Sequence, residues 1–247
     1  MLWYYNINEF DYSKNTSGGF GTGADLTING ETNGRGSGNI STNVADGYQA
    51  LQNNTTGKEN VAIGYQSLQN NTTGEYNIAC GAFALQNCTT GVGSTAVGKN
   101  ALGRLTTGGN NIAIGGSSSA LNSVSSNNVG VGVRALCYCL GGDNTGIGYN
   151  SQFGTTSTSD LAIKNTSVGS ESLTSNLSGQ LNTAIGYKAY YNGTVYNNST
   201  ALGASTVITG NQAVAIGYLA TASDNQIVLG TANETVLCKG TSATYGA

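Results

Sequence analysis

Aromatic side chains are the residues of this chain best suited to binding chemistry. Tyrosine occurs 14 times, and four tyrosines lie close together at Tyr187, Tyr190, Tyr191 and Tyr196. A tyrosine ring offers apolar faces and a polar hydroxyl, so it can stack on a sugar ring. Phe153 opens a second candidate segment, the polar stretch 153–160. We take these five residues as candidate glycan or receptor contacts, with packing as the alternative.

Patterns typical of catalysis and metal binding are missing from the sequence. Histidine is absent and the 12 carboxylates are dispersed, so no base is placed to activate a serine or cysteine. The five cysteines form no disulfide framework, and Cys137-Tyr-Cys139 is not a usual zinc pair. We expect free thiols, no enzymatic activity, and no catalytic, cofactor-binding or metal-binding residue.

Charge and hydropathy exclude two further classes. The net charge of −3 gives nucleic acid no basic surface to bind. No stretch approaches the ~20 apolar residues of a membrane span. The opening residues Met1–Asn6 lack the basic start and apolar run of a secretory signal. We expect no nucleic-acid partner, no membrane span, and a route outside the cell other than ordinary secretion.

A repeated motif, approximately Asn-x-Ala-(Ile/Val)-Gly, organises the sequence. The glycines that close the repeats are Gly47, Gly64, Gly81, Gly98, Gly115, Gly132, Gly148, Gly169, Gly186, Gly203, Gly217 and Gly230. The step is 17 residues in most repeats, with one longer step of 21 and two final steps of 14 and 13. A fixed period this short predicts a solenoid, in which each coil is buried only by its neighbours.

Residues before each closing glycine alternate in size, which predicts a short strand. Bulky residues stand one and three positions before it, and we call these two sets the bulky columns. One position before the glycine stand Ile63, Val97, Ile114, Val131, Ile147, Val168, Ile185, Leu202, Ile216 and Leu229. Three positions before it stand Val44, Val61, Ile78, Thr95, Ile112, Val129, Thr145, Thr166, Thr183, Thr200, Val214 and Ile227. The small column lies between them: Ala45, Ala62, Ala79, Ala96, Ala113, Gly130, Gly146, Ser167, Ala184, Ala201 and Ala215. We expect the bulky columns, with Cys80 in an Ile/Val slot, to fill the interior. The small column would then face another chain.

A second strand is predicted after each closing glycine. It would carry a small residue and a leucine, as in Ala84-Leu85, before a polar turn such as Asn70–Gly74. Asparagine and glycine tolerate the backbone dihedrals of tight turns. Each coil would then have two strands of four or five residues and two turns. Asparagines four positions before the glycine, such as Asn60 and Asn77, predict a ladder in which each amide bonds to the next coil.

The motifs resemble known fibre repeats. Asn182–Ala189, and the 14-residue step from Ser199–Gly203 to Ala213–Gly217, resemble the head repeats of YadA-type trimeric autotransporter adhesins. The 17-residue form with Tyr-x-Ala-Leu-x-Asn-Asn-Thr-Thr-Gly is similar to repeats in phage tail fibres and in fibre proteins of large algal viruses. The resemblance implies an all-β, left-handed parallel β-roll of about 12 coils, assembled as a parallel homotrimer with an attachment or structural role.

The chain divides into three predicted parts. Residues 41–232 form the β-roll, and residues 233–247 form an exit segment. Residues 1–40 lie outside the repeat and hold Trp3, Tyr4, Tyr5 and Phe10. Because open solenoid ends invite stacking, this segment should cap the rod. Alternatively it docks onto the end of another subunit and builds a filament.

The expected function is structural and adhesive. The chain lacks the signal, heptad stalk and membrane anchor of the autotransporters, which favours the shaft of a virion or tail fibre that contributes to host attachment. The expected location is the virion surface or an extracellular appendage. The first alternative is a self-polymerising extracellular filament joined through residues 1–40. The second is a carbohydrate-binding module with its site at the tyrosines or in the 149–165 loop.

Overall fold

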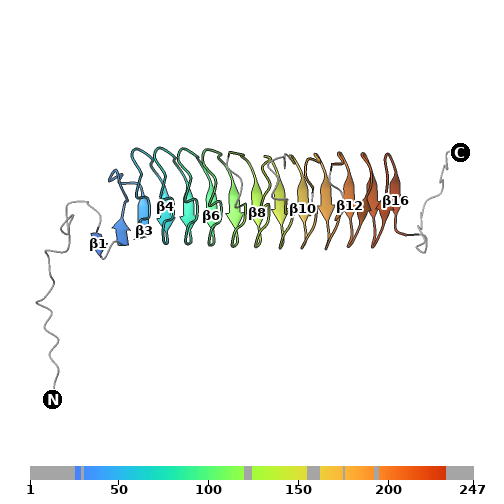
Figure 1. Ribbon diagram of the computed structural model, residues 1–247, viewed down its shortest axis with the longest axis horizontal. Coiled ribbons are helices and arrows are strands. Elements are labelled where there is room, and N and C mark those ends of the chain that lie inside the picture. Colours follow the sequence, from blue (N-terminus) through green and yellow to red (C-terminus); the bar gives the residue numbers. More distant parts are fainter. Residues whose placement is uncertain are drawn as a thin grey trace, which may run out of the picture.

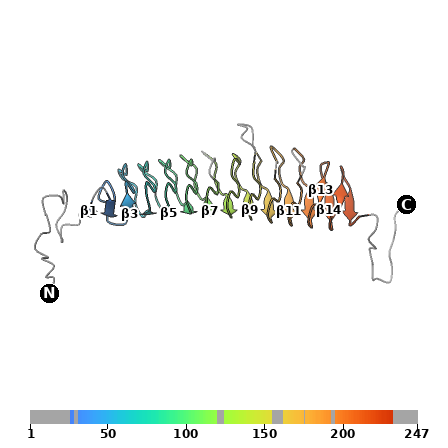
Figure 2. The ribbon, with the colours of Figure 1, turned by 60° about the horizontal axis from the view of Figure 1, so that its bottom comes forward.

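The computed structural model describes residues 26–28, 31–119, 124–154, 162–174, 176–191 and 195–231. These residues form an all-β parallel solenoid that repeats about every 17 residues, and no helix occurs among them. Figures 1 and 2 show the coils stacked one after another into a rod, with the strands along one side and the turns along the other.

One strand from each coil joins a continuous parallel sheet in the order β3 to β12, then β14 and β16. These strands are β3 (Val44–Tyr48), β4 (Val61–Ile63), β5 (Ile78–Cys80), β6 (Thr95–Val97), β7 (Ile112–Ile114), β8 (Val129–Val131), β9 (Thr145–Ile147), β10 (Thr166–Val168), β11 (Thr183–Ile185), β12 (Thr200–Leu202), β14 (Val214–Ile216) and β16 (Ile227–Leu229). Equivalent residues pair directly, as Val61 with Ile78. Each column is therefore a straight row along the rod.

A hairpin precedes the first coil. Strands β1 (Leu26–Ile28) and β2 (Glu31–Gly34) pair antiparallel, and β2 pairs antiparallel with β3. The hairpin therefore occupies the edge of β3 that faces away from β4. The predicted boundaries at 40 and 232 stay predictions. Trp3, Tyr4, Tyr5 and Phe10 lie outside the described residues.

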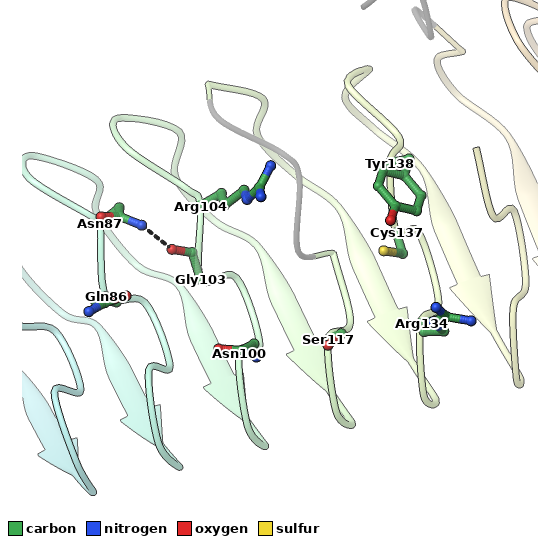
Figure 3. Close-up of a pocket in the computed structure, with 9 residues that line it drawn as sticks. All are labelled: Gln86, Asn87, Asn100, Gly103, Arg104, Ser117, Arg134, Cys137 and Tyr138. Atoms are coloured by element: carbon green, nitrogen blue, oxygen red, sulfur yellow. Dashed lines mark hydrogen bonds between the residues drawn. The ribbon is translucent and has the colours of Figure 1, made fainter. Parts of the chain in front are cut away.

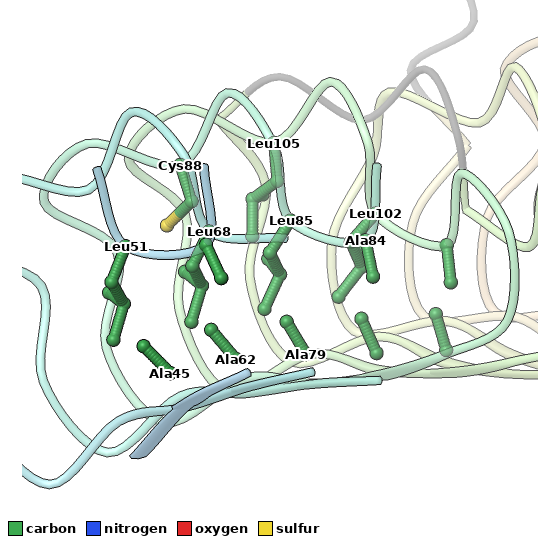
Figure 4. Packing of buried hydrophobic residues seen from close by; sticks show 14 residues of the cluster. Ala45, Leu51, Ala62, Leu68, Ala79, Ala84, Leu85, Cys88, Leu102 and Leu105 are labelled. Carbon is green, nitrogen blue, oxygen red and sulfur yellow. The ribbon is translucent and has the colours of Figure 1, made fainter. Parts of the chain in front are cut away.

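The strands face opposite to our prediction. In every strand from β4 to β12 the middle, small-column residue is buried, and its two bulky neighbours are half-buried or exposed. Figure 4 shows Ala45, Ala62 and Ala79 pointing from the strands toward Leu51, Leu68 and Leu85 on the opposite wall. Because the leucine row already fills the narrow interior, only a small residue fits beneath it.

The second strand of each 17-residue coil is also absent from the described residues. The leucines after the glycine adopt left-handed backbone conformations instead, for example Leu68 at φ 46° and Leu85 at φ 49°. Their backbone groups still bond between coils, since the Leu68 N–H donates to the Ala84 carbonyl at 3.0 Å. A second strand forms only in the shortened final coils, where β13 (Val207–Ile208) pairs with β15 (Thr221–Ala222).

The predicted asparagine ladder is confirmed. The Asn77 backbone N–H donates to Asn60 Oδ1 at 3.0 Å, and Asn60 Nδ2 donates to the Gly74 carbonyl at 2.8 Å. The same two bonds recur one coil later, from Ser94 N–H to Asn77 Oδ1 at 3.0 Å and from Asn77 Nδ2 to the Gly91 carbonyl at 2.8 Å. Each buried amide thus satisfies two backbone groups that water cannot reach.

The closing glycines make the turn that returns the chain after each strand. From Gly47 to Gly217 their φ angles lie between 118° and 138°, a region that L side chains rarely adopt. They also stack directly, because a Cβ on Gly98 would lie 2.8 Å from the carbonyl carbon of Gly115. Glycine is therefore required here for both conformation and space.

Gly98→Ala should destabilise the rod strongly, because the added methyl is strained at φ +128° and meets backbone of the next coil. We expect a loss of roughly 1–3 kcal/mol or more in the free energy of unfolding, measured by denaturant titration. Gly116→Ala is the matched control. Its Cβ would have nothing within 4 Å, so the change should stay within about 0.5 kcal/mol. Equal effects of the two substitutions would contradict this account of the turn.

Asn77→Ala should lower the free energy of unfolding by about 1–3 kcal/mol, because it leaves the Ser94 N–H and the Gly91 carbonyl without partners. Asn77→Ser should cost less. Serine already occupies the equivalent position at Ser94, where its Oγ accepts from the Asn111 N–H at 3.3 Å. If alanine and serine were equally tolerated, the ladder would not stabilise the coils as described.

Candidate functional site

A row of exposed apolar side chains runs along the sheet side of the rod. We call it the apolar stripe: Val44, Ile63, Ile78, Val97, Ile112, Ile114, Ile147, Ile185, Leu202, Ile227 and Leu229. All are at least 37% exposed, and all belong to the bulky columns. In-register pairing aligns the stripe from β3 to β16. Strands β8, β10 and β14 add half-buried side chains such as Val131, Val168 and Ile216 to the same rows. Large apolar patches of this kind are typical of surfaces that contact another molecule.

Aromatic rings border one end of the stripe. Tyr48 and Tyr65 follow closing glycines, and their rings stack with centroids 5.3 Å apart and planes 9° apart. Phe83 continues the row, edge-on to Tyr65 at 5.2 Å. Tyrosine after the closing glycine in two successive coils therefore produces ring packing between Tyr48 and Tyr65.

The predicted tyrosine cluster is only partly a surface. Tyr187 and Tyr191 are exposed, and Tyr196 is half-buried. Tyr190 is fully buried, and its hydroxyl donates to the Tyr196 carbonyl at 3.2 Å. Burial raises the pKa of Tyr190 far above its usual value. Tyr190 was therefore wrongly selected as a glycan contact, because its ring packs in the core and is not accessible.

Lys188 lies beside the two exposed rings of this cluster. Its Nζ is 5.3 Å from the Tyr187 ring centroid, 5.2 Å from that of Tyr191 and 3.5 Å from Glu171 Oε2. A hydrogen bond with Tyr187 and attraction to Glu171 raise the pKa of Lys188. One face of each ring is thus already in a cation–π contact, and a sugar stacking there would have to displace the ammonium group.

Phe153 lies in a different environment. Its ring meets Tyr138 edge-on at 5.0 Å, and the Arg134 guanidinium carbon lies 5.4 Å from its centroid. Of the predicted 153–160 loop, only Phe153 and Gly154 are described. The sequence did not predict these two partners of Phe153. Arg134 could have been found by comparing repeats, because Asn100 and Ser117 occupy the equivalent position in the two preceding repeats.

A cavity of about 350 Å³ lies beside this group (Figure 3). Its walls come from neighbouring coils, so no single motif encodes it. The lining residues are Gln86, Asn87, Asn100, Gly103, Arg104, Ser117, Arg134, Cys137 and Tyr138. We call it the arginine groove.

The cysteines that the structure describes are free thiols, as predicted, and Cys238 lies outside the described residues. Cys80 was predicted to lie in the core. It is only half-buried, because its bulky-column slot faces outward. Cys88, Cys137 and Cys139 are buried. Desolvation raises the pKa of the Cys88 thiol to about 11, although a backbone hydrogen bond from Gly91 opposes the shift.

The described part of the chain holds no group of three or more His, Cys, Asp or Glu side chains that could bind a metal ion. Within the same residues, no helix has the length and hydropathy needed to cross a membrane. Comparison of the chain with protein-family models, with curated proteins and with solved structures gave no match.

Thiol labelling should follow the burial of the cysteines. At pH 8, iodoacetamide should modify Cys80 of the single, unassembled chain well before Cys88, because alkylation requires an accessible thiolate and burial raises the Cys88 pKa to about 11. Peptide mass mapping of the folded protein would measure both sites. Labelling of the two at equal rates, with no unfolding, would contradict the outward orientation of the bulky columns.

Proposed function

We propose that this chain is a shaft subunit of a trimeric fibre, of the kind carried by virions or phage tails, and that it contributes to host attachment. The observation that carries the proposal is the apolar stripe. Its residues project away from an interior already filled by the alanine and leucine rows, so they cannot be buried by their own coils.

A second copy of the chain is the partner that fits the stripe best. The stripe repeats with the strand spacing, ~4.8 Å, and another copy running in the same direction has the same spacing throughout. Parallel copies therefore match along the whole rod of roughly 50 Å, whereas an unrelated surface would match locally. Burying one exposed Val, Ile or Leu side chain between two copies contributes up to about 1.5–3 kcal/mol to the free energy of association. We infer three copies, and not two, from the resemblance of the repeats to those of trimeric adhesins and fibres.

Such a rod would bind its target through many copies of the same surface. Parallel copies would present the same surface several times, and linked weak contacts gain avidity without any strong single site. The low charge content of 9% fits a mechanical role. The exposed Ile227 of the last described strand favours a second candidate function, a filament in which rods join end to end.

Charged substitutions in the stripe should break the assembly. The wild-type chain of 25.0 kDa should sediment as a species of about 75 kDa, three times its own mass. Ile112→Glu with Ile114→Glu should shift the mass toward one chain, because each copy would bring two carboxylates into the interface. Val92→Glu is the control, since Val92 is exposed but lies outside the stripe. A wild type that sediments as a single chain would overturn the proposal.

Cross-linking gives an independent readout of chain direction. Parallel copies in register place their Cys80 residues at the same level of the rod. A short bismaleimide should therefore link chains that keep Cys80, and Cys80→Ser should remove that link. Both chains carry Cys238→Ser, so that a link through that thiol does not enter the readout. In this background, links that persist in Cys80→Ser, or the absence of links in the assembled Cys80 protein, would contradict the parallel arrangement.

A further inference from the structure

The arginine groove concentrates positive charge in a weakly acidic chain. The sequence has three arginines and a net charge of −3, and two of the three line this groove. Arg104 follows the closing glycine Gly98, and Arg134 follows the closing glycine Gly132, so the two arginines come from different coils.

Among the described residues, the charge in the groove has no local counter-ion. None of the lining residues is acidic, and the ion pairs among the described residues are Lys58–Glu75 and Lys188–Glu171. The polar lining residues Gln86, Asn87, Asn100 and Ser117 are neutral and half-buried. Both arginines are exposed. An anion entering the groove would therefore meet two guanidinium groups without displacing a carboxylate.

The groove has two rows that run along the rod, as Figure 3 shows. Asn100, Ser117 and Arg134 occupy the same place in three successive coils and share left-handed φ angles of 55–60°. Arg104 and Tyr138 stand on the opposite row. Two coil steps separate the arginines along the rod, roughly 10 Å at ~4.8 Å per step. This length suits an extended ligand of more than one ring better than a single small ion.

Aromatic contacts hold one arginine in place. The Arg134 guanidinium lies 5.4 Å from the Phe153 ring centroid, and Tyr138 meets that ring edge-on at 5.0 Å. A guanidinium stacked on a ring loses less freedom when it binds a carboxylate or sulfate in the bidentate geometry it prefers. The Tyr138 ring adds a partly apolar wall, of the type on which sugar rings stack.

We propose that the arginine groove binds an anionic carbohydrate, a glycan that carries carboxylate or sulfate groups. Arg104 and Arg134 bind the anionic groups, the amide of Asn100 bonds to a hydroxyl, and Tyr138 packs against a ring. The proposal rests on the proposed attachment function, for which it names the chemical class of the receptor. A nucleic acid fits less well, because it would require a longer basic surface than two arginines provide.

The test is a binding titration of the full chain with four probes: sialyllactose and neutral lactose, and a chondroitin sulfate tetrasaccharide and a neutral chitin tetrasaccharide. We expect at least tenfold tighter binding of one acidic probe than of its partner, weakening as salt increases. The first pair tests recognition of a single carboxylate, and the second tests recognition of sulfate and uronate groups together. Equal binding within both pairs, or no binding to any probe, would overturn the proposal.

Variants locate the binding. Arg104→Gln with Arg134→Gln should weaken binding of the preferred probe at least tenfold, and Tyr138→Ala should weaken it by a smaller factor. Arg35→Gln removes the same charge outside the groove and should leave binding unchanged. Retained binding in the double variant would overturn the assignment, as would an equal loss in Arg35→Gln.

Light-scattering mass on the same samples separates this inference from the fibre proposal, since the groove and the stripe share no residue. An assembled wild type that binds no acidic probe refutes the groove and leaves the fibre intact. A single chain that binds through the two arginines supports the groove and refutes the fibre.

Discussion

The narrow interior of one coil is the constraint on which the rest of the structure depends. Each turn of the solenoid encloses a single layer, in which a leucine such as Leu85 faces an alanine such as Ala79. From β4 to β12 only glycine, alanine and serine occupy the strand side of that layer, so the flanking Val and Ile side chains turn outward. The outward stripe is thus a direct result of how little each coil encloses. A coil this thin gains little stability from its own core, which makes association along the rod the natural complement.

Hydrogen bonds between coils supply the stability that the thin core lacks. The asparagine ladder joins each coil to the next through both the amide oxygen and the amide nitrogen of residues such as Asn60. The backbone of the leucine row also forms hydrogen bonds between coils. These leucines adopt left-handed conformations, each of which carries about 1–2 kcal/mol of strain. These terms recur in every coil, so the rod can extend without changing its design, as in other repeat proteins.

The sequence predicted the period, the strand before each closing glycine and the asparagine ladder, because each depends on local spacing. The second strand predicted after the glycine was wrong for the 17-residue coils. It could not predict which strand face is inside, since alternation shows only that Ile112 and Ile114 share a face. The size of these side chains favoured the interior, but the leucines that face the strand already fill that space. Tyr190 illustrates the same lesson for the site. It stands four residues after Gly186, where other coils place the buried leucine. Its position in the repeat therefore predicted burial, whereas its polar hydroxyl had suggested exposure. Arg104 and Arg134 were missed because they converge from separate coils at different repeat positions.

The central claim is that the apolar stripe is covered by other copies in solution. It is tested most directly by NMR of isoleucine δ1 methyl groups in the presence of a soluble paramagnetic agent. Ile208 is fully buried within its own chain and provides the internal reference. The account predicts that the methyl groups of Ile63, Ile112 and Ile114 relax almost as slowly as that of Ile208, although each side chain is at least 40% exposed in the isolated chain. Fast relaxation of all three, as expected from that exposure, would contradict the claim.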